Sequence, residues 1–198
     1  MLKKLLLNKK EFHVTVEDLP ILIHGKNMTG SSLFTVSLVA DLYNQGSKIF
    51  FLSGYHMARD EFLEQTNNLC NGIFLTSNTE TIPEVQKKRI IFIRKEDPDW
   101  FIKVVQVLSD IEERVILVKN IDLFPEEVFD AVVNKSKLII SGDIDKCSYR
   151  DKLISKSYST KILFSKPKVD LGVTLPFLKQ YEGYLSSKNE TGVVSLQM

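Results

Sequence analysis

The sequence predicts an α/β fold: one domain built on a mostly parallel sheet with helices on both faces. Short apolar runs recur along the chain without the two-residue alternation of half-exposed strands. Segments with helical apolar spacing lie between these runs, and this order is typical of parallel sheets. With 198 residues, 43% of them hydrophobic, the chain has the size of a single domain over residues 1–198.

The expected strands are runs rich in Ile, Val, Leu and Phe. They span 20–24, 48–53, 89–93, 114–118, 137–141 and 161–165. Apolar periodicity predicts helices at 32–44, 98–109 and 125–133. The first helix is expected to end at Gln45-Gly46, because glycine commonly follows the last helical residue. The stretch 70–84 is ambiguous, with a strand expected at 72–76 and a loop at 77–81.

The C-terminal segment has a different pattern. Two β-like pieces, 181–186 and 192–197, flank the turn-forming sequence SKNETG. They predict a C-terminal hairpin, within an appendage at 166–198, that packs at the edge of the sheet. An exposed strand edge can pair with a second copy or with another protein. Aromatic residues beside lysines in this segment can alternatively stack on single-stranded bases.

Composition and charge narrow the function classes. Twenty-six Lys and Arg against 25 Asp and Glu give a formal charge of +1, so net charge does not support a nucleic-acid partner, although a local basic patch would allow one. Cys70 and Cys147 lack nearby ligand residues, which predicts reduced thiols in a cytoplasmic protein. No run approaches the roughly 18 apolar residues of a membrane span.

The loop after the first expected strand has the spacing of a phosphate-binding loop. In the pattern GxxxxGK[ST], backbone amides wrap the phosphates, the lysine neutralises charge and the hydroxyl helps to hold magnesium. The sequence GKNMTGSS places Gly25 and Gly30 at the required spacing and Ser32 at the hydroxyl position. Ser31 replaces the lysine, and a hydroxyl donates a hydrogen bond but supplies no positive charge.

With its flanking strands and helix, this loop resembles the first βαβ unit of P-loop NTPases of the RecA-like and AAA+-like kind, with a degenerate Walker A motif. The resemblance is best over residues 12–53. It implies ATP as ligand, with or without Mg²⁺, and a nucleotide-binding set of Gly25, Lys26, Asn27, Thr29, Gly30, Ser31 and Ser32.

Three interpretations of the altered loop stay open. Lys26 substitutes for the missing lysine, or the loop is a remnant that binds nucleotide weakly or not at all. Alternatively, the loop is an ordinary polar connection in which Thr29, Ser31 or Ser32 caps the following helix.

The segment VILVKNIDLF resembles the second NTPase motif, Walker B, in which an apolar strand ends at an acidic residue that holds magnesium through water. Lys119 occupies the acidic position, followed by Asn120 and Asp122. A lysine reverses the local charge, which argues against ordinary metal-assisted hydrolysis. Lys119 either reaches toward a phosphate from the shared strand ends or is a solvated lysine, and Asp122 lies too far along the turn to replace the acid.

The next strand brings Ser141, Asp143 and Asp145 to the same end of the sheet, where a polar residue of related ATPases senses the terminal phosphate. Asp143 either supplies a carboxylate for a metal ion or water, or belongs to SGD as a common turn sequence. His24 ends the first strand and lies near the expected phosphate site.

The leading hypothesis is a degenerate P-loop nucleotide-binding or pseudo-ATPase domain with an assembly or regulatory role, associating with itself or with a protein partner. One alternative is an active ATPase assisted by Lys26 or Lys119 in a DNA-handling machine. The other is a nucleotide-independent interaction module.

Overall fold

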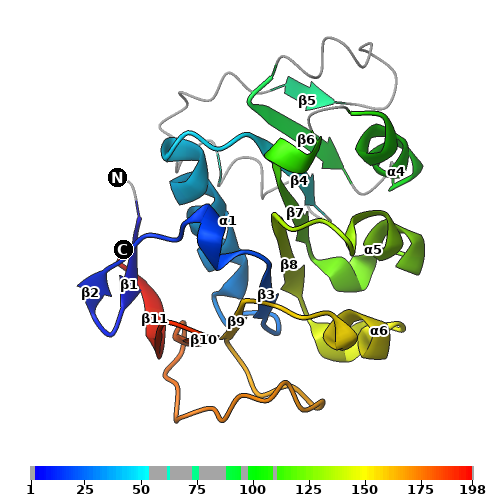
Figure 1. Cartoon of the computed structure of the whole chain (residues 1–198). Coiled ribbons are helices and arrows are strands. Elements are labelled where there is room, and N and C mark those ends of the chain that lie inside the picture. Colours follow the sequence, from blue (N-terminus) through cyan, green and yellow to red (C-terminus); the bar gives the residue numbers. More distant parts are fainter. Residues whose placement is uncertain are drawn as a thin grey trace.

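A single mixed sheet organises the chain. The computed structural model describes residues 3–53, 62, 73–75, 88–94, 98–108 and 111–197. Within these ranges the strands form one 11-stranded sheet in the order β2-β1-β11-β10-β9-β3-β8-β7-β4-β6-β5 (Figure 1). Neighbouring strands from β9 to β5 are parallel, whereas the strands from β2 to β10 are antiparallel and continue the sheet beyond β9. The predicted α/β class is confirmed.

The parallel strands are those that the apolar runs predict. They are β3 (Ile21–His24), β4 (Ile49–Ser53), β6 (Ile90–Arg94), β7 (Val115–Lys119), β8 (Leu138–Gly142) and β9 (Thr160–Leu163). The ambiguous stretch near residue 72 contains a further strand, β5 (Ile73–Leu75), and the loop expected at 77–81 lies outside the described residues.

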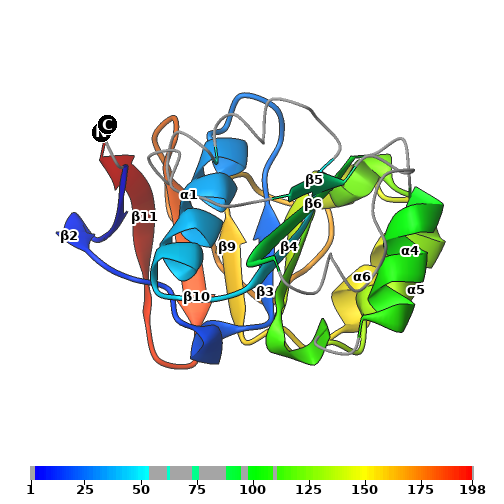
Figure 2. The ribbon, with the colours of Figure 1, turned by 90° about the horizontal axis from the view of Figure 1, so that it is seen from above.

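Helices cover both faces of the sheet, as predicted (Figure 2). One face is covered by α1 (Ser31–Asn44), which begins one residue earlier than expected. The other is covered by α4 (Pro98–Val107), α5 (Glu126–Val132) and the unpredicted α6 (Arg150–Ser155).

Side chains alternate between the two faces along each strand and so build two cores. On β3, Ile21 and Ile23 lie in the core beneath α1, here called the α1-side core. Leu22, between them, lies in the opposite core, which also contains residues of α4, α5 and α6 and is here called the α4-side core. Because both faces are buried, the central strands are apolar throughout, and this explains why the sequence lacks two-residue alternation.

The predicted C-terminal hairpin is present as β10 (Gly183–Ser187) and β11 (Thr191–Gln197). Its outer edge is not exposed, contrary to expectation, because β1 (Lys4–Leu7) pairs with β11 (Figure 1). Asn8 and Lys9, with φ of 51° and 69°, form the two-residue turn that leads to β2 (Lys10–Glu11). The sheet therefore ends on this side in a two-residue charged strand, which is a poor template for further pairing.

The division of the chain at residue 166 stays a prediction, since β10 and β11 belong to the same sheet as β9. None of the described helices has the length and apolar character needed to cross a membrane.

Phe34 tests how strongly α1 is anchored to the sheet. Its side chain is fully buried, and its ring centroid lies 5.2 Å from that of Phe164. We expect Phe34→Ala to lower the free energy of unfolding in urea by about 3–5 kcal/mol, because the truncation leaves a cavity. Val107→Ala on α4, where the side chain is 48% exposed, should change it by no more than about 0.5 kcal/mol. Equal losses in the two variants would show that α1 is not anchored through this ring.

Candidate functional site: the loop between β3 and α1

The loop from β3 to α1 is shaped by two glycines for different reasons. A Cβ on Gly25 would overlap the Ser31 side chain and lie 2.9 Å from the Thr29 hydroxyl, so the loop can close only over a glycine. Gly30 has a φ of 87°, in the left-handed region that favours glycine, and it immediately precedes α1. The spacing found in the sequence therefore corresponds to a tightly folded loop.

The N-terminus of α1 is not capped by a side chain. Its N-cap residue is Gly30, and the Thr29 hydroxyl donates to the Lys26 carbonyl at 2.7 Å instead of accepting from the helix. The interpretation of Thr29, Ser31 or Ser32 as a cap is therefore wrong. In the described part of the chain, the backbone N–H groups of Ser31 and Ser32 have no acceptor. Uncapped amides at a helix N-terminus are suited to binding an anion.

Lys26 does not extend over the loop. Its ammonium lies 3.7 Å from Asp145 Oδ2, in the connection that follows β8, and its side chain is 46% exposed. Asn27 and Ser32 are exposed, whereas Ser31 is half-buried and its hydroxyl lies 3.3 Å from that of Thr29. The loop therefore offers amides and hydroxyls, with its one lysine turned toward a carboxylate.

Lys119 lies in a polar row at the end of three neighbouring strands. In register it stands between Ser53 of β4 and Ser141 of β8. Leu117 packs in the α1-side core and Val118 in the α4-side core, so alternation directs the Lys119 side chain toward α1.

The expectation of a solvated Lys119 is wrong, because the residue is 2% exposed. Strands β4 and β8 flank β7, and α1 covers its face, so water is excluded from the side chain. The ammonium donates to Asn120 Oδ1 at 3.3 Å. Asn120 itself has a φ of 62° and turns the chain away from β7. The side chain at the acidic position of the motif is thus a buried lysine.

Carboxylates and a histidine gather where β3 and β8 end. Asp122 Oδ1 accepts the Asp143 N–H at 3.0 Å, so Asp122 contacts the turn that follows β8. The Ile144 N–H donates to His24 Nδ1 at 3.2 Å, and Ser165 Oγ lies 3.2 Å from His24 Nε2. Nδ1 is thus an acceptor, and Nε2 carries the proton toward Ser165.

Burial lowers the pKa of His24, and the attraction of Asp145 and Asp143 only partly offsets that effect. The imidazole is consequently neutral at physiological pH. Sequence analysis placed His24 near the phosphate site by position. Its partner Ser165 was missed because 141 residues separate the two in sequence.

The candidate site lies at a switch point of the sheet. β3 continues into α1 on one face, whereas its neighbour β8 leads to α6 on the other. Connections that diverge in this way leave a crevice at the strand ends, where ligands bind in open α/β sheets. The Gly25 N–H donates to the Gly142 carbonyl at 3.2 Å, and this bond joins the two connections.

An apolar hollow adjoins the glycine loop. It measures about 440 Å³ and is lined by Met28, Gly30, Ser32, Leu33, Phe34, Phe164, Tyr181 and Leu196. The Tyr181 ring lies against Gly30, where an added Cβ would approach it to 3.0 Å, and Tyr181 is 50% exposed. The hollow has the size of a small-molecule site.

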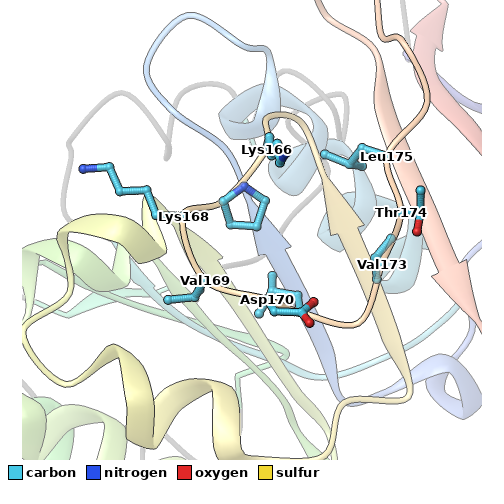
Figure 3. Close-up of a pocket in the computed structure, with 9 residues that line it drawn as sticks. Lys166, Lys168, Val169, Asp170, Val173, Thr174 and Leu175 are labelled. Atoms are coloured by element: carbon cyan, nitrogen blue, oxygen red, sulfur yellow. The ribbon is translucent and has the colours of Figure 1, made fainter.

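A second hollow, of about 400 Å³, is formed by the loop at 166–175 that follows β9 (Figure 3). Four apolar side chains of this loop pack in or against the α4-side core: Val169, Leu171, Val173 and Leu175. This loop meets the carboxylate cluster through the Lys168 N–H, which donates to Asp145 Oδ1 at 2.8 Å.

Solved structures share this fold over nearly the whole chain. The genome packaging NTPase B204 from Sulfolobus turreted icosahedral virus 2, in complex with ATP-gammaS, superposes with a TM-score of 0.59 at 11% identity, covering 92% of this chain and 98% of that chain. The same NTPase in complex with AMPPCP gives 0.56 at 10% identity, with 90% and 96% covered. The DNA-packaging ATPase B204 from Sulfolobus turreted icosahedral virus gives 0.53 at 10% identity, with 90% and 96% covered.

These likenesses confirm the predicted RecA-like P-loop fold. No protein-family profile and no curated protein matches the sequence. At such low identity the superpositions establish the fold alone.

Gly25 provides a test of the loop geometry. We expect Gly25→Ala to destabilise the protein by roughly 1–3 kcal/mol, as overpacking does, because the new methyl group overlaps Ser31. The double variant Gly25→Ala with Ser31→Gly removes the overlapping side chain and should recover most of that loss, measured by urea denaturation against Ser31→Gly alone. Strictly additive losses would show that the two residues do not touch.

Proposed function

We propose that this chain is a nucleotide-binding domain whose bound ATP serves assembly or regulation instead of efficient hydrolysis. The observation that carries the proposal is the buried Lys119, which stands where a magnesium-binding carboxylate is expected. The P-loop NTPase fold and the uncapped N-terminus of α1 support the binding part of this function.

The loop amides supply phosphate recognition. Gly30 ends the loop and opens α1, so the N–H groups of Ser31 and Ser32 and the positive end of the helix face the crevice together. The hydroxyls of Ser31 and Ser32 add hydrogen-bond donors. We assign the phosphate subsite to Gly25, Lys26, Asn27, Thr29, Gly30, Ser31 and Ser32, with Lys119, Asn120, Asp122, Ser141 and Asp143 around the neighbouring strand ends.

The charges of this site favour binding over catalysis. Hydrolysis of a triphosphate relies on a lysine and a metal ion held against the outer phosphates. Here Ser31 occupies the lysine position, and the ammonium of Lys119 repels a metal ion at the strand end. The same ammonium attracts phosphate, so we propose that Lys119 substitutes for magnesium as the counter-charge of the nucleotide.

The apolar hollow beside Gly30 suits the nucleoside. A nucleotide whose phosphates lie in the glycine loop would place its base toward Tyr181, and aromatic rings stack on bases with little preference among them. We propose that a protein partner or a second copy binds the nucleotide-bound form, because Met28 and Phe177 are 83% and 93% exposed.

A second candidate is an active ATPase in a DNA-handling machine. It is favoured by the structural neighbours, which are described as genome-packaging and DNA-packaging enzymes, and by the partial exposure of the Lys26 side chain, at 46%. Steady release of phosphate, abolished by Lys26→Ala, would support this candidate.

If ATP leaves thermal stability unchanged, the chain is a nucleotide-independent interaction module.

Thermal unfolding with millimolar ATP, in Mg²⁺ or in EDTA, tests the proposed function. We expect a rise of several degrees in both buffers, since a ligand at about 100 times its Kd adds roughly 2.7 kcal/mol. Lys119→Met should weaken ATP binding at least about tenfold, because a charge-assisted hydrogen bond to phosphate is lost. Lys188→Met, in the exposed turn between β10 and β11, should not. A shift seen only with Mg²⁺, or full affinity in Lys119→Met, would contradict the role given to Lys119.

Tyr181→Ala tests the nucleoside subsite. Loss of stacking is worth about 1–3 kcal/mol per base, so we expect ATP affinity to fall roughly 5- to 150-fold. Tripolyphosphate, which lacks a base, should bind the variant and the unaltered protein equally, as measured by calorimetry. Phe177→Ala is the control, since Phe177 does not line the hollow. Equal weakening of both ligands would mean that Tyr181 supports the loop and does not contact the base.

A further inference from the structure

Three side chains at the ends of β3 and β8 are arranged as a set of metal ligands. His24 ends β3, and Asp143 and Asp145 follow β8. One ligand atom from each residue lies within 4.8 Å of the other two. This cluster lies beside the glycine loop, on the face of the sheet opposite to the Lys119 side chain. His24 contacts Ile144, which belongs to the α4-side core, whereas Lys119 is directed toward α1.

Two carboxylate oxygens of this cluster lack hydrogen-bond donors. Asp143 Oδ1 and Asp145 Oδ2 are buried without one, and the two side chains are only 8% and 5% exposed. Their charges are met at longer range by two solvent-reaching lysines, with Lys26 3.7 Å from Asp145 Oδ2 and Lys146 3.4 Å from Asp143 Oδ2. Buried carboxylate oxygens are normally satisfied, so the unsatisfied pair points to a cation between them.

His24 can supply the nitrogen ligand if Nδ1 exchanges the Ile144 N–H for the ion. The Nδ1 lone pair faces Ile144, the residue between Asp143 and Asp145 in the sequence. The Nε2 proton faces Ser165 Oγ. A metal-binding histidine usually donates its second ring N–H to a fixed acceptor, and Ser165 provides one. The ion would take the Nδ1 lone pair that now accepts the Ile144 N–H at 3.2 Å.

We propose that His24, Asp143 and Asp145 bind one divalent transition-metal ion of the Mn²⁺ or Zn²⁺ class. One imidazole and two carboxylates form a mixed nitrogen and oxygen set, which such ions accept and which Mg²⁺, with its preference for oxygen and water, does not favour. Ser165 is the positioning residue that holds the imidazole. The site is separate from the strand end at Lys119, where a P-loop enzyme would be expected to hold its magnesium.

The ion would also control the loop lysine. A divalent cation on Asp145 replaces the Lys26 ammonium as its counter-charge, and the freed lysine can then turn toward the phosphate subsite. Metal and nucleotide would therefore bind cooperatively, by linkage. This consequence rests on the proposed function, whereas the metal site itself does not.

Isothermal titration of the nucleotide-free protein with MnCl₂, ZnCl₂ and MgCl₂ tests the site. We expect one equivalent of Mn²⁺ or Zn²⁺ to bind and Mg²⁺ to bind at least about tenfold more weakly. Asp143→Asn should weaken Mn²⁺ binding by at least about tenfold. The matched controls are Asp151→Asn and His13→Gln, which should leave Mn²⁺ binding unchanged. The Asp151 side chain is 89% exposed on α6, and the His13 side chain is 63% exposed beside Asp41. No Mn²⁺ or Zn²⁺ binding at millimolar metal, or equal binding by Asp143→Asn, overturns the proposal.

Pulsed electron paramagnetic resonance of the unaltered protein with Mn²⁺ needs no variant to fold. We expect nitrogen coupling from an imidazole in the unaltered protein and in His13→Gln, and no such coupling in His24→Gln. Absence of the coupling from the unaltered protein would overturn the proposed metal site. Failure of ATP binding with metal binding intact would refute the proposed function alone. Metal binding that leaves ATP affinity unchanged would refute the cooperativity.

Discussion

The parallel pairing of β3 with β8 is the constraint on which the site depends. It aligns Ile23 with Ser141 and His24 with Gly142, and the bond from the Gly25 N–H to the Gly142 carbonyl carries the pairing one step past the strands. The glycine loop and the turn after β8 are thereby held together although their chain paths diverge to opposite faces. Both the contact of Lys26 with Asp145 and that of Ile144 with His24 require this alignment.

In the proposed phosphate site, Lys119 lies on a strand, and Lys26 of the loop is turned toward Asp145. We propose that the loop amides recognise phosphate without a lysine at the Ser31 position, because the loop geometry is fixed by Gly25 and Gly30. Catalysis is more demanding, since it needs charge at the atoms where it develops during bond breaking. Lys119 lies on one side of the strand ends, and Asp143 and Asp145 lie on the other, so the lysine and the carboxylates are separated by the sheet.

The sequence predicts the central strands well, because burial on both faces leaves uninterrupted apolar runs. It also predicts α1, which has 14 residues and ends before Gln45-Gly46 as expected. It misses α6, whose six residues include one buried side chain, Leu153. It also misses the β1–β2 hairpin, since the turn at Asn8-Lys9 lacks the usual glycine. The glycine spacing located the loop, but neither the burial of Lys119 nor the contacts of His24 could be inferred, because both arise from strands that are distant in sequence.

The placement of β11 between β1 and β10 has a consequence for how the protein is made. Both edges of β3 pair with strands that are synthesised more than 110 residues later, and β1 pairs with β11, the last of the described strands. A growing chain on the ribosome therefore carries β3 without a partner strand until β8 has been synthesised. The crevice at the end of β3 can form only after β8 and β9 have emerged, so a product interrupted before them would lack the site.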